Sequence, residues 1–136
     1  MSTPNLPAAP FKSIYASVTV AVTDTGVLYK CPNNIDVAGS SYDAGTSRFT
    51  LALRQPIAPG LAVAAVLPWD TGDAAVPPTK YSAPAVRYDL DSDNNISKIH
   101  VFWFTTDTAG DTEAAAPFAW HLALFDVGNV RPFPTS

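Results

Sequence analysis

The chain has 136 residues, 47% of them hydrophobic, and a formal net charge of −4. This length predicts a single domain with a sizeable core, and no apolar run approaches the ~20 residues that a membrane-spanning helix needs. Lysine and arginine are scattered singly, which argues against a nucleic-acid or anionic-membrane surface, because binding phosphates requires clustered cations.

Proline is the unusual residue, at 13 of 136 positions against 7 glycines and a single glutamate. The prolines fall between apolar runs, where each one breaks a helix or marks the end of a strand. Strong helix formers other than alanine are scarce. The composition therefore favours an all-β protein.

The first segment, residues 1–11, places prolines at positions 4, 7 and 10. This spacing favours an extended, polyproline-like arm with no core of its own. A disordered leader is the alternative, because chain termini often fray. The segment lacks the basic and apolar regions of a secretory signal. The single cysteine, Cys31, has no partner for an internal disulfide, which favours a reducing cytoplasm, and we expect it to be a small buried hydrophobe.

Residues 12–23 form the clearest predicted strand, because apolar side chains recur at every second position. A turn at 24–26 and a returning strand at 27–30 follow. The asparagine and glycine content predicts loops at 33–34 and at 39–45. The side chains that this first strand is expected to place in the core are Ile14, Ala16, Val18, Val20 and Val22.

Residues 47–54 alternate in the same way, whereas residues 61–67 are apolar on both faces. We expect the latter strand either to lie centrally with both faces covered or to pack on another subunit. Residues 68–84 form a long irregular segment that is a candidate interaction loop. A short strand at 85–90 and a turn at 91–95 follow. The core side chains expected from the alternating strand are Phe49, Leu51 and Leu53.

The two most apolar runs, residues 96–105 and 117–127, predict core strands that we expect to be neighbours in one sheet. Trp103 and Trp120 follow the alternation of these runs and are expected to be buried. Trp69, in the long loop, is the one tryptophan expected to be accessible. The side chains expected to share the core positions of the two tryptophans are Ile99, Val101, Phe118, Leu122 and Leu124.

Seven or eight short strands separated by turn signals, with no helical period, predict a two-sheet antiparallel sandwich or jelly roll. The sandwich is expected to span residues 12–130. An extended N-terminal arm (1–11) and a proline-bearing C-terminal tail (131–136) would flank it.

The sharpest local pattern is a run of alternating carboxylates at Asp89, Asp91 and Asp93, which makes a weak candidate for a calcium loop. Asn94 stands where such a loop has glycine, and His100 stands where it has a bidentate glutamate. The flanking segments are also strands instead of helices. A solvated hairpin turn explains the same residues and is favoured.

His100 and His121 lie on different predicted core strands, and facing each other they would form half of a metal site or a titrating pair. No third ligand is placed by the sequence, so two histidines on polar faces are favoured. The loop carboxylates show no pair at the separation that a glycosidase needs, and no nucleophile motif is present. We therefore expect neither catalysis nor a cofactor.

Four features of the chain are typical of one class of protein: the proline-spaced arm, the strand-rich body, the mild acidity, and loops rich in alanine, threonine and aspartate. In these features the chain resembles the small β-sandwich decoration, or cement, proteins of tailed-phage capsids. Such proteins sit on the outside of an icosahedral shell, often as dimers or trimers, and brace neighbouring major capsid subunits. The resemblance covers the whole chain and carries over no functional residue. It implies a virion protein of the capsid exterior, made in the host cytoplasm, whose partner is the major capsid protein.

Apolar residues in segments without a core of their own are the contacts that we expect with the capsid. The alternative function is a carbohydrate- or receptor-binding sandwich of a fibre or tail, using Trp69, Tyr81 and loop carboxylates. A jelly-roll enzyme with a metal at the two histidines is the third hypothesis. The expected capsid contacts are Leu6, Pro7, Phe11, Trp69 and Phe133.

Overall fold

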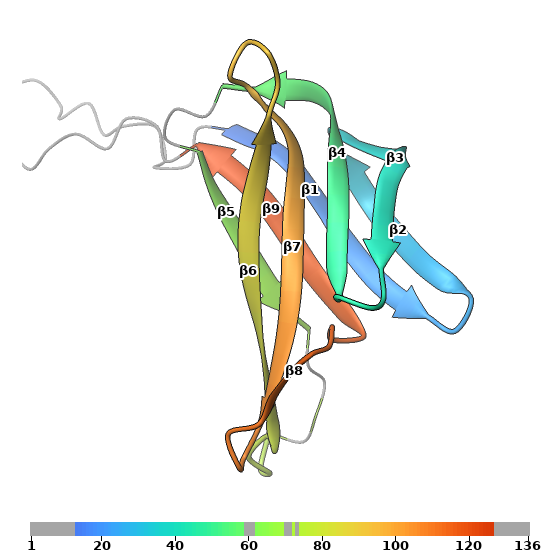
Figure 1. Cartoon of the computed structure of the whole chain (residues 1–136), viewed down its shortest axis with the longest axis vertical. Helices are drawn as coiled ribbons and strands as arrows, with labels where there is room; N and C mark the ends of the chain where they lie inside the picture. The colour runs from blue at the N-terminus through green and yellow to red at the C-terminus, as the bar shows by residue number, and fades with distance from the viewer. Residues whose placement is uncertain (1–12, 59–61, 70–71, 73, 127–136) are drawn as a thin grey trace, which may run out of the picture.

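The structure is a computed structural model that describes residues 13–58, 62–69, 72 and 74–126, shown as the coloured ribbon in Figure 1. Period-two alternation and β-branched residues make most of the described residues extended. The strands of the described residues are β1 (Ser13–Thr23), β2 (Gly26–Asn33), β3 (Ile35–Asp43), β4 (Arg48–Ile57), β5 (Ala62–Pro68), β6 (Lys80–Leu90), β7 (Ile96–Asp107), β8 (Thr112–Ala114) and β9 (Ala119–Asp126).

These strands form two antiparallel sheets that pack face to face, which confirms the predicted all-β sandwich. The four-stranded sheet has the order β2-β1-β9-β5, and the five-stranded sheet has the order β3-β4-β7-β6 with β8 paired to the far end of β7. No helix among the described residues has the length and apolar character to cross a membrane. Ser13 pairs with Asp126, so the two ends of the described chain lie side by side.

The core between the sheets is built around Trp103 on β7 and Trp120 on β9, whose ring centroids lie 5.7 Å apart. Phe49 on β4 meets Trp120 edge to face at 5.0 Å, and all three side chains are fully buried. The prediction that the two apolar runs are neighbours in one sheet is wrong. They belong to different sheets and face each other, because each run buries its tryptophan against the opposite layer.

The loop predicted at residues 39–45 is instead largely strand, since β3 continues to Asp43. The Gly39 N–H donates to the Asp36 carboxylate at 3.2 Å, and the Ser40 hydroxyl donates to the Asp36 carbonyl at 2.7 Å. The same hydroxyl accepts the Ala52 N–H from β4, at 3.1 Å. The register between β3 and β4 shifts here, so the glycine and serine content makes a bulge within the strand.

Two further predictions fail at bulges. Ile14, expected in the core, is 58% exposed, because the register between β1 and β9 shifts between Ile14 and Ala16. Cys31, expected to be buried, is exposed with φ of 51° at the irregularity between β1 and β2. An extra residue in one strand shifts the alternation, so the side chains beyond it point to the opposite face of the sheet.

The apolar strand expected either to lie centrally or to pack on another subunit is β5. It lies at the edge of the four-stranded sheet, so the prediction of a central position is wrong. Leu67 is 62% exposed as a result. Pro84, expected to mark a strand end, lies inside β6 instead. It is tolerated there because β6 is also an edge strand, which needs no N–H on its free side.

The indole N–H groups of Trp103 and Trp120 are buried without a hydrogen-bond partner. Replacing Trp120 by alanine opens a cavity and should lower the free energy of unfolding by about 3–5 kcal/mol. Phenylalanine keeps a ring and removes the unpaired donor, so its cost should be smaller, about 1–2 kcal/mol. Urea denaturation of both variants measures this difference. Equal losses in the free energy of unfolding for the two substitutions would show that filling the core with a ring at position 120 does not contribute as expected.

Candidate functional site

Of the five contact residues predicted from the sequence, Trp69 alone lies in the part of the chain that the structure describes. Its side chain is 50% exposed, as expected. Leu6, Pro7, Phe11 and Phe133 lie outside the described residues, and their contacts remain predictions.

Trp69 follows β5 directly and is held in place through its backbone. Its N–H donates to the Ala119 carbonyl at the start of β9, at 3.0 Å. Its ring centroid lies 5.6 Å from Phe118, which is 54% exposed, and 6.5 Å from His121. Phe118 was expected in the core, but it precedes β9 and lies outside it. We call Trp69 and Phe118 the aromatic pair.

The loop beside the aromatic pair joins β5 to β6 at the same end of the sandwich, the lower end in Figure 1. Its residues from Ala74 to Lys80 line an open hollow of about 800 Å³. Val76 contributes an exposed apolar side chain there. This end therefore presents apolar groups on irregular backbone, the usual setting for a binding loop.

The outer face of the four-stranded sheet carries few charges: Lys30 on β2, opposite Thr19, is an exposed cation, whereas β1, β9 and β5 present none. The alternate residues of β1, β9 and β5 that face inward pack in the core, so the remaining residues point outward. None of these outward side chains of the described strands β1, β9 and β5 is aspartate, glutamate, lysine or arginine. We call this surface the uncharged face; it consists of Ile14, Ser17, Thr19, Ala21, Val63, Ala65, Leu67, His121, Ala123 and Phe125.

The outer face of the other sheet is charged. The strand register places acidic and basic side chains opposite one another there, as in the pairs Asp43 with Arg48 and Asp89 with Lys98. Charged residues on the outer face of an exposed sheet are the norm for a soluble surface. The charged side chains on this face include Asp36, Asp43, Arg48, Arg87, Asp89 and Lys98.

The two histidines lie on opposite outer faces of the sandwich, so the hypothesis that they face each other is wrong. His100 belongs to β7 in one sheet and His121 to β9 in the other. His121 Nδ1 is hydrogen-bonded to Thr19 Oγ1 at 2.9 Å. Among the described residues, no group of three or more histidine, cysteine, aspartate or glutamate side chains is placed to hold a metal ion.

His100 is the middle member of a chain of hydrogen bonds across three strands. Its Nε2–H donates to Asp89 Oδ2 at 2.7 Å, and its Nδ1 lies 3.1 Å from Thr50 Oγ1. A hydroxyl, an imidazole and a carboxylate in sequence are the parts of an activated nucleophile. Thr50, His100 and Arg87 are register partners inside a regular sheet, however, so the local backbone N–H groups serve strand pairing. The three hydrogen-bonded side chains therefore stabilise the pairing of their strands. Their proximity could be recognised only from the strand register, because the sequence alone does not show which strands pair.

The candidate calcium loop is organised as a turn. Asp91 Oδ1 accepts the N–H groups of Asp93 at 2.9 Å and Asn95 at 3.0 Å, while Asn94 has φ of 62°. Asp89 is engaged with His100. Two of the three proposed carboxylates thus bond to protein donors, in keeping with the favoured hairpin-turn interpretation. Asp107 closes a second turn in the same way, accepting the N–H groups of Ala109 and Asp111.

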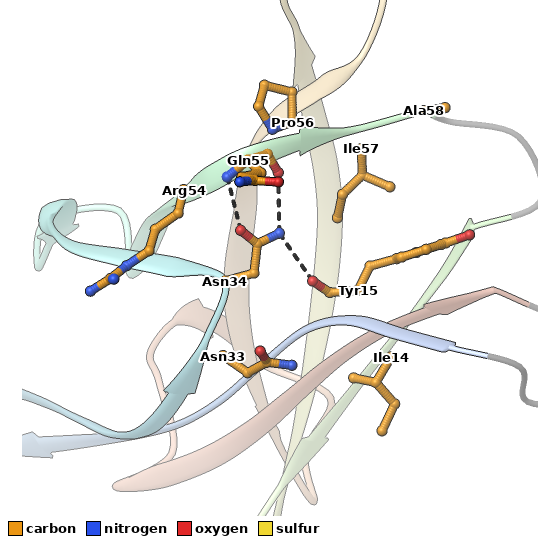
Figure 2. Close-up of a pocket in the computed structure, with 9 residues that line it drawn as sticks. All are labelled: Ile14, Tyr15, Asn33, Asn34, Arg54, Gln55, Pro56, Ile57 and Ala58. Carbon is orange, nitrogen blue, oxygen red and sulfur yellow. Dashed lines mark hydrogen bonds between the residues drawn. The ribbon is translucent and has the colours of Figure 1, made fainter.

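A second hollow, of about 640 Å³, lies between the sheets at the end where Ser13 and Asp126 meet. Figure 2 shows Asn34 spanning it. Asn34 Nδ2 donates to the carbonyls of Tyr15 on β1 (3.0 Å) and Gln55 on β4 (3.1 Å), and its Oδ1 accepts the Gln55 N–H at 2.8 Å. The amide therefore ties strands of both sheets together. The sequence predicted only a loop at this position.

Comparison with known proteins gives no match among family models, curated proteins or solved structures. The surfaces described above therefore carry the functional argument.

Asn34 has φ of 57°, a conformation that glycine adopts without strain, so Asn34→Gly removes the hydrogen bonds and little else. We expect a loss of about 1–3 kcal/mol in the free energy of unfolding, because the Gln55 and Tyr15 backbone groups lose their partner. The matched control is Asn33→Gly, one residue earlier on β2. Thermal or urea unfolding compares the two, and similar losses would show that the amide does not tie the sheets together.

Proposed function

We propose that this chain is a virion structural protein that attaches to the outside of an icosahedral capsid and braces contacts between major capsid subunits. Its action is binding, without catalysis and without a cofactor. The supporting observation is the aromatic pair: two exposed rings carried on a sheet framework, with the Trp69 backbone bonded to Ala119.

An exposed tryptophan of this kind is well suited to anchor an interface. Tryptophan is enriched among the residues that dominate binding energy, and a side chain already held in position loses less conformational entropy on binding. A modest interface for each copy is sufficient on a capsid, because the shell offers many equivalent sites and linked copies bind with avidity.

The test uses capsids assembled from the major capsid protein of the same genome, mixed with the purified chain and sedimented. We expect saturable co-sedimentation, weakened about tenfold or more by Trp69→Ala and by Phe118→Ala, because each removes an anchoring ring. Leu90→Ala is the control, since Leu90 is 52% exposed at the opposite end of β6. Binding that is absent, or equally weakened by the control, would overturn the proposal.

The second candidate function is carbohydrate or receptor binding by a fibre or tail module. It is favoured by the position of His121 beside Trp69, with centroids 6.5 Å apart, which adds a polar ring to an exposed aromatic platform. Trp69→Ala should then abolish saturable binding on a glycan array, measured with and without a chelator. Glycan binding that survives this substitution, or is absent in the parent chain, would remove this candidate.

A further inference from the structure

The aromatic pair lies beside a row of polar side chains on the outer face of the β2-β1-β9-β5 sheet. Strand register places Lys30 opposite Thr19 and Thr19 opposite His121, and residues directly opposite each other in an antiparallel pair point to the same face. His121 in turn lies 6.5 Å from Trp69, measured between ring centroids. We call Lys30, Thr19 and His121 the polar row; it begins at the edge strand β2 and ends beside the exposed indole.

Thr19 orients the imidazole at the end of the polar row. Its Oγ1 lies 2.9 Å from His121 Nδ1, so the two side chains are hydrogen-bonded. Threonine is branched at Cβ and has a restricted χ1 angle, which limits the orientations of a ring that bonds to it. Because Nδ1 is engaged with Thr19, a partner that bonds the imidazole meets Nε2. The ring therefore offers one polar atom at the side of Trp69.

Lys30 gives the polar row its charge. It is exposed, and the one ion pair among the described residues joins His100 and Asp89 on the other sheet. The outward side chains of the described strands β1, β9 and β5 include no carboxylate, so none of them compensates the lysine. An uncompensated cation beside an uncharged surface attracts anions. This end of the sheet therefore favours a negatively charged partner group, although the chain as a whole has a net charge of −4.

The spacing of the strands suits a partner segment with one acidic and one apolar group. Neighbouring strands lie ~4.8 Å apart, so the backbones at Lys30 and His121, which are two strands apart, are about 10 Å from each other. A carboxylate placed over Thr19 is then within reach of the lysine ammonium on one side and of the imidazole on the other. An apolar side chain of the same segment lies over Trp69 and Phe118, which supply exposed aromatic surface.

We propose that the attachment site recognises a partner segment that carries a carboxylate close to an apolar or aromatic side chain. The carboxylate binds at the polar row, and the apolar side chain packs on the aromatic pair. Thr19 keeps the imidazole of His121 in the orientation that this contact requires. The inference rests on the proposed attachment through the aromatic pair, and it adds to that proposal the chemistry of the partner.

Two matched ligands test this chemistry without a capsid. N-acetyl-phenylalanine and N-acetyl-phenylalaninamide share the ring and differ by one carboxylate. Each is titrated into the full chain while tryptophan emission is recorded, and the Trp69→Ala chain supplies the signal of the two buried tryptophans. We expect the carboxylate to bind about threefold or more tightly than the amide at low salt, because a hydrogen bond to an ionised group is stronger and is screened little there.

Substitutions in the polar row should remove the preference for the carboxylate. Lys30→Gln removes the charge, and Thr19→Val releases the imidazole while keeping the shape of the side chain. The matched controls lie on the outer face of the other sheet: Lys98→Gln removes a lysine there, and Thr50→Val removes the threonine that bonds His100. Both controls should keep the preference of the parent chain. Circular dichroism confirms that each variant is folded.

No binding of either ligand, or equal affinity for the two, would overturn the inference. So would a preference that survives both substitutions in the polar row, or one that either control loses. Capsids that do not bind the chain, while the preference for the carboxylate remains, would reject capsid attachment alone. Capsid binding that is lost in Trp69→Ala but unchanged in Lys30→Gln and Thr19→Val would retain attachment and reject the role of the polar row.

Discussion

The contact between Trp103 and Trp120 is the interaction on which the rest of the structure depends. Each ring is carried by an inner strand that pairs on both sides, β7 in one sheet and β9 in the other, so the pair joins the two layers directly. Phe49 and the buried aliphatic residues of both sheets pack around the rings and complete the core. The unpaired N–H groups of Trp103 and Trp120 are a cost to stability that this packing offsets.

Sequence alternation predicted well which side chains are buried in the core, but it did not predict which strands pair. Phe49, Leu51 and Leu53 are buried as their period of two requires, and the two tryptophans are as well. Which strands pair is set by contacts between residues far apart in the chain, so the placement of β7 and β9 in different sheets was not accessible from local pattern. Ile14 and Cys31 show the second limit, because a bulge reverses side chains without a strong signal in composition.

The candidate site was predicted in part, for related reasons. Trp69 was identified because a tryptophan between prolines in a long loop has no core to enter. Phe118 was missed, because alternation continued one residue beyond the start of β9. The uncharged face was not anticipated either: each strand alone shows a few threonines, serines and alanines. The absence of charge becomes evident only when the register brings the outward residues of β1, β9 and β5 together.

The position of the described chain ends has a practical consequence for display. Strand β9 runs from Ala119, bonded to Trp69, to Asp126, paired with Ser13, a span of roughly 23 Å at ~3.3 Å per residue. A label attached at Ser13 or at Asp126 would therefore lie at the end of the sandwich remote from the aromatic pair and would leave both rings uncovered.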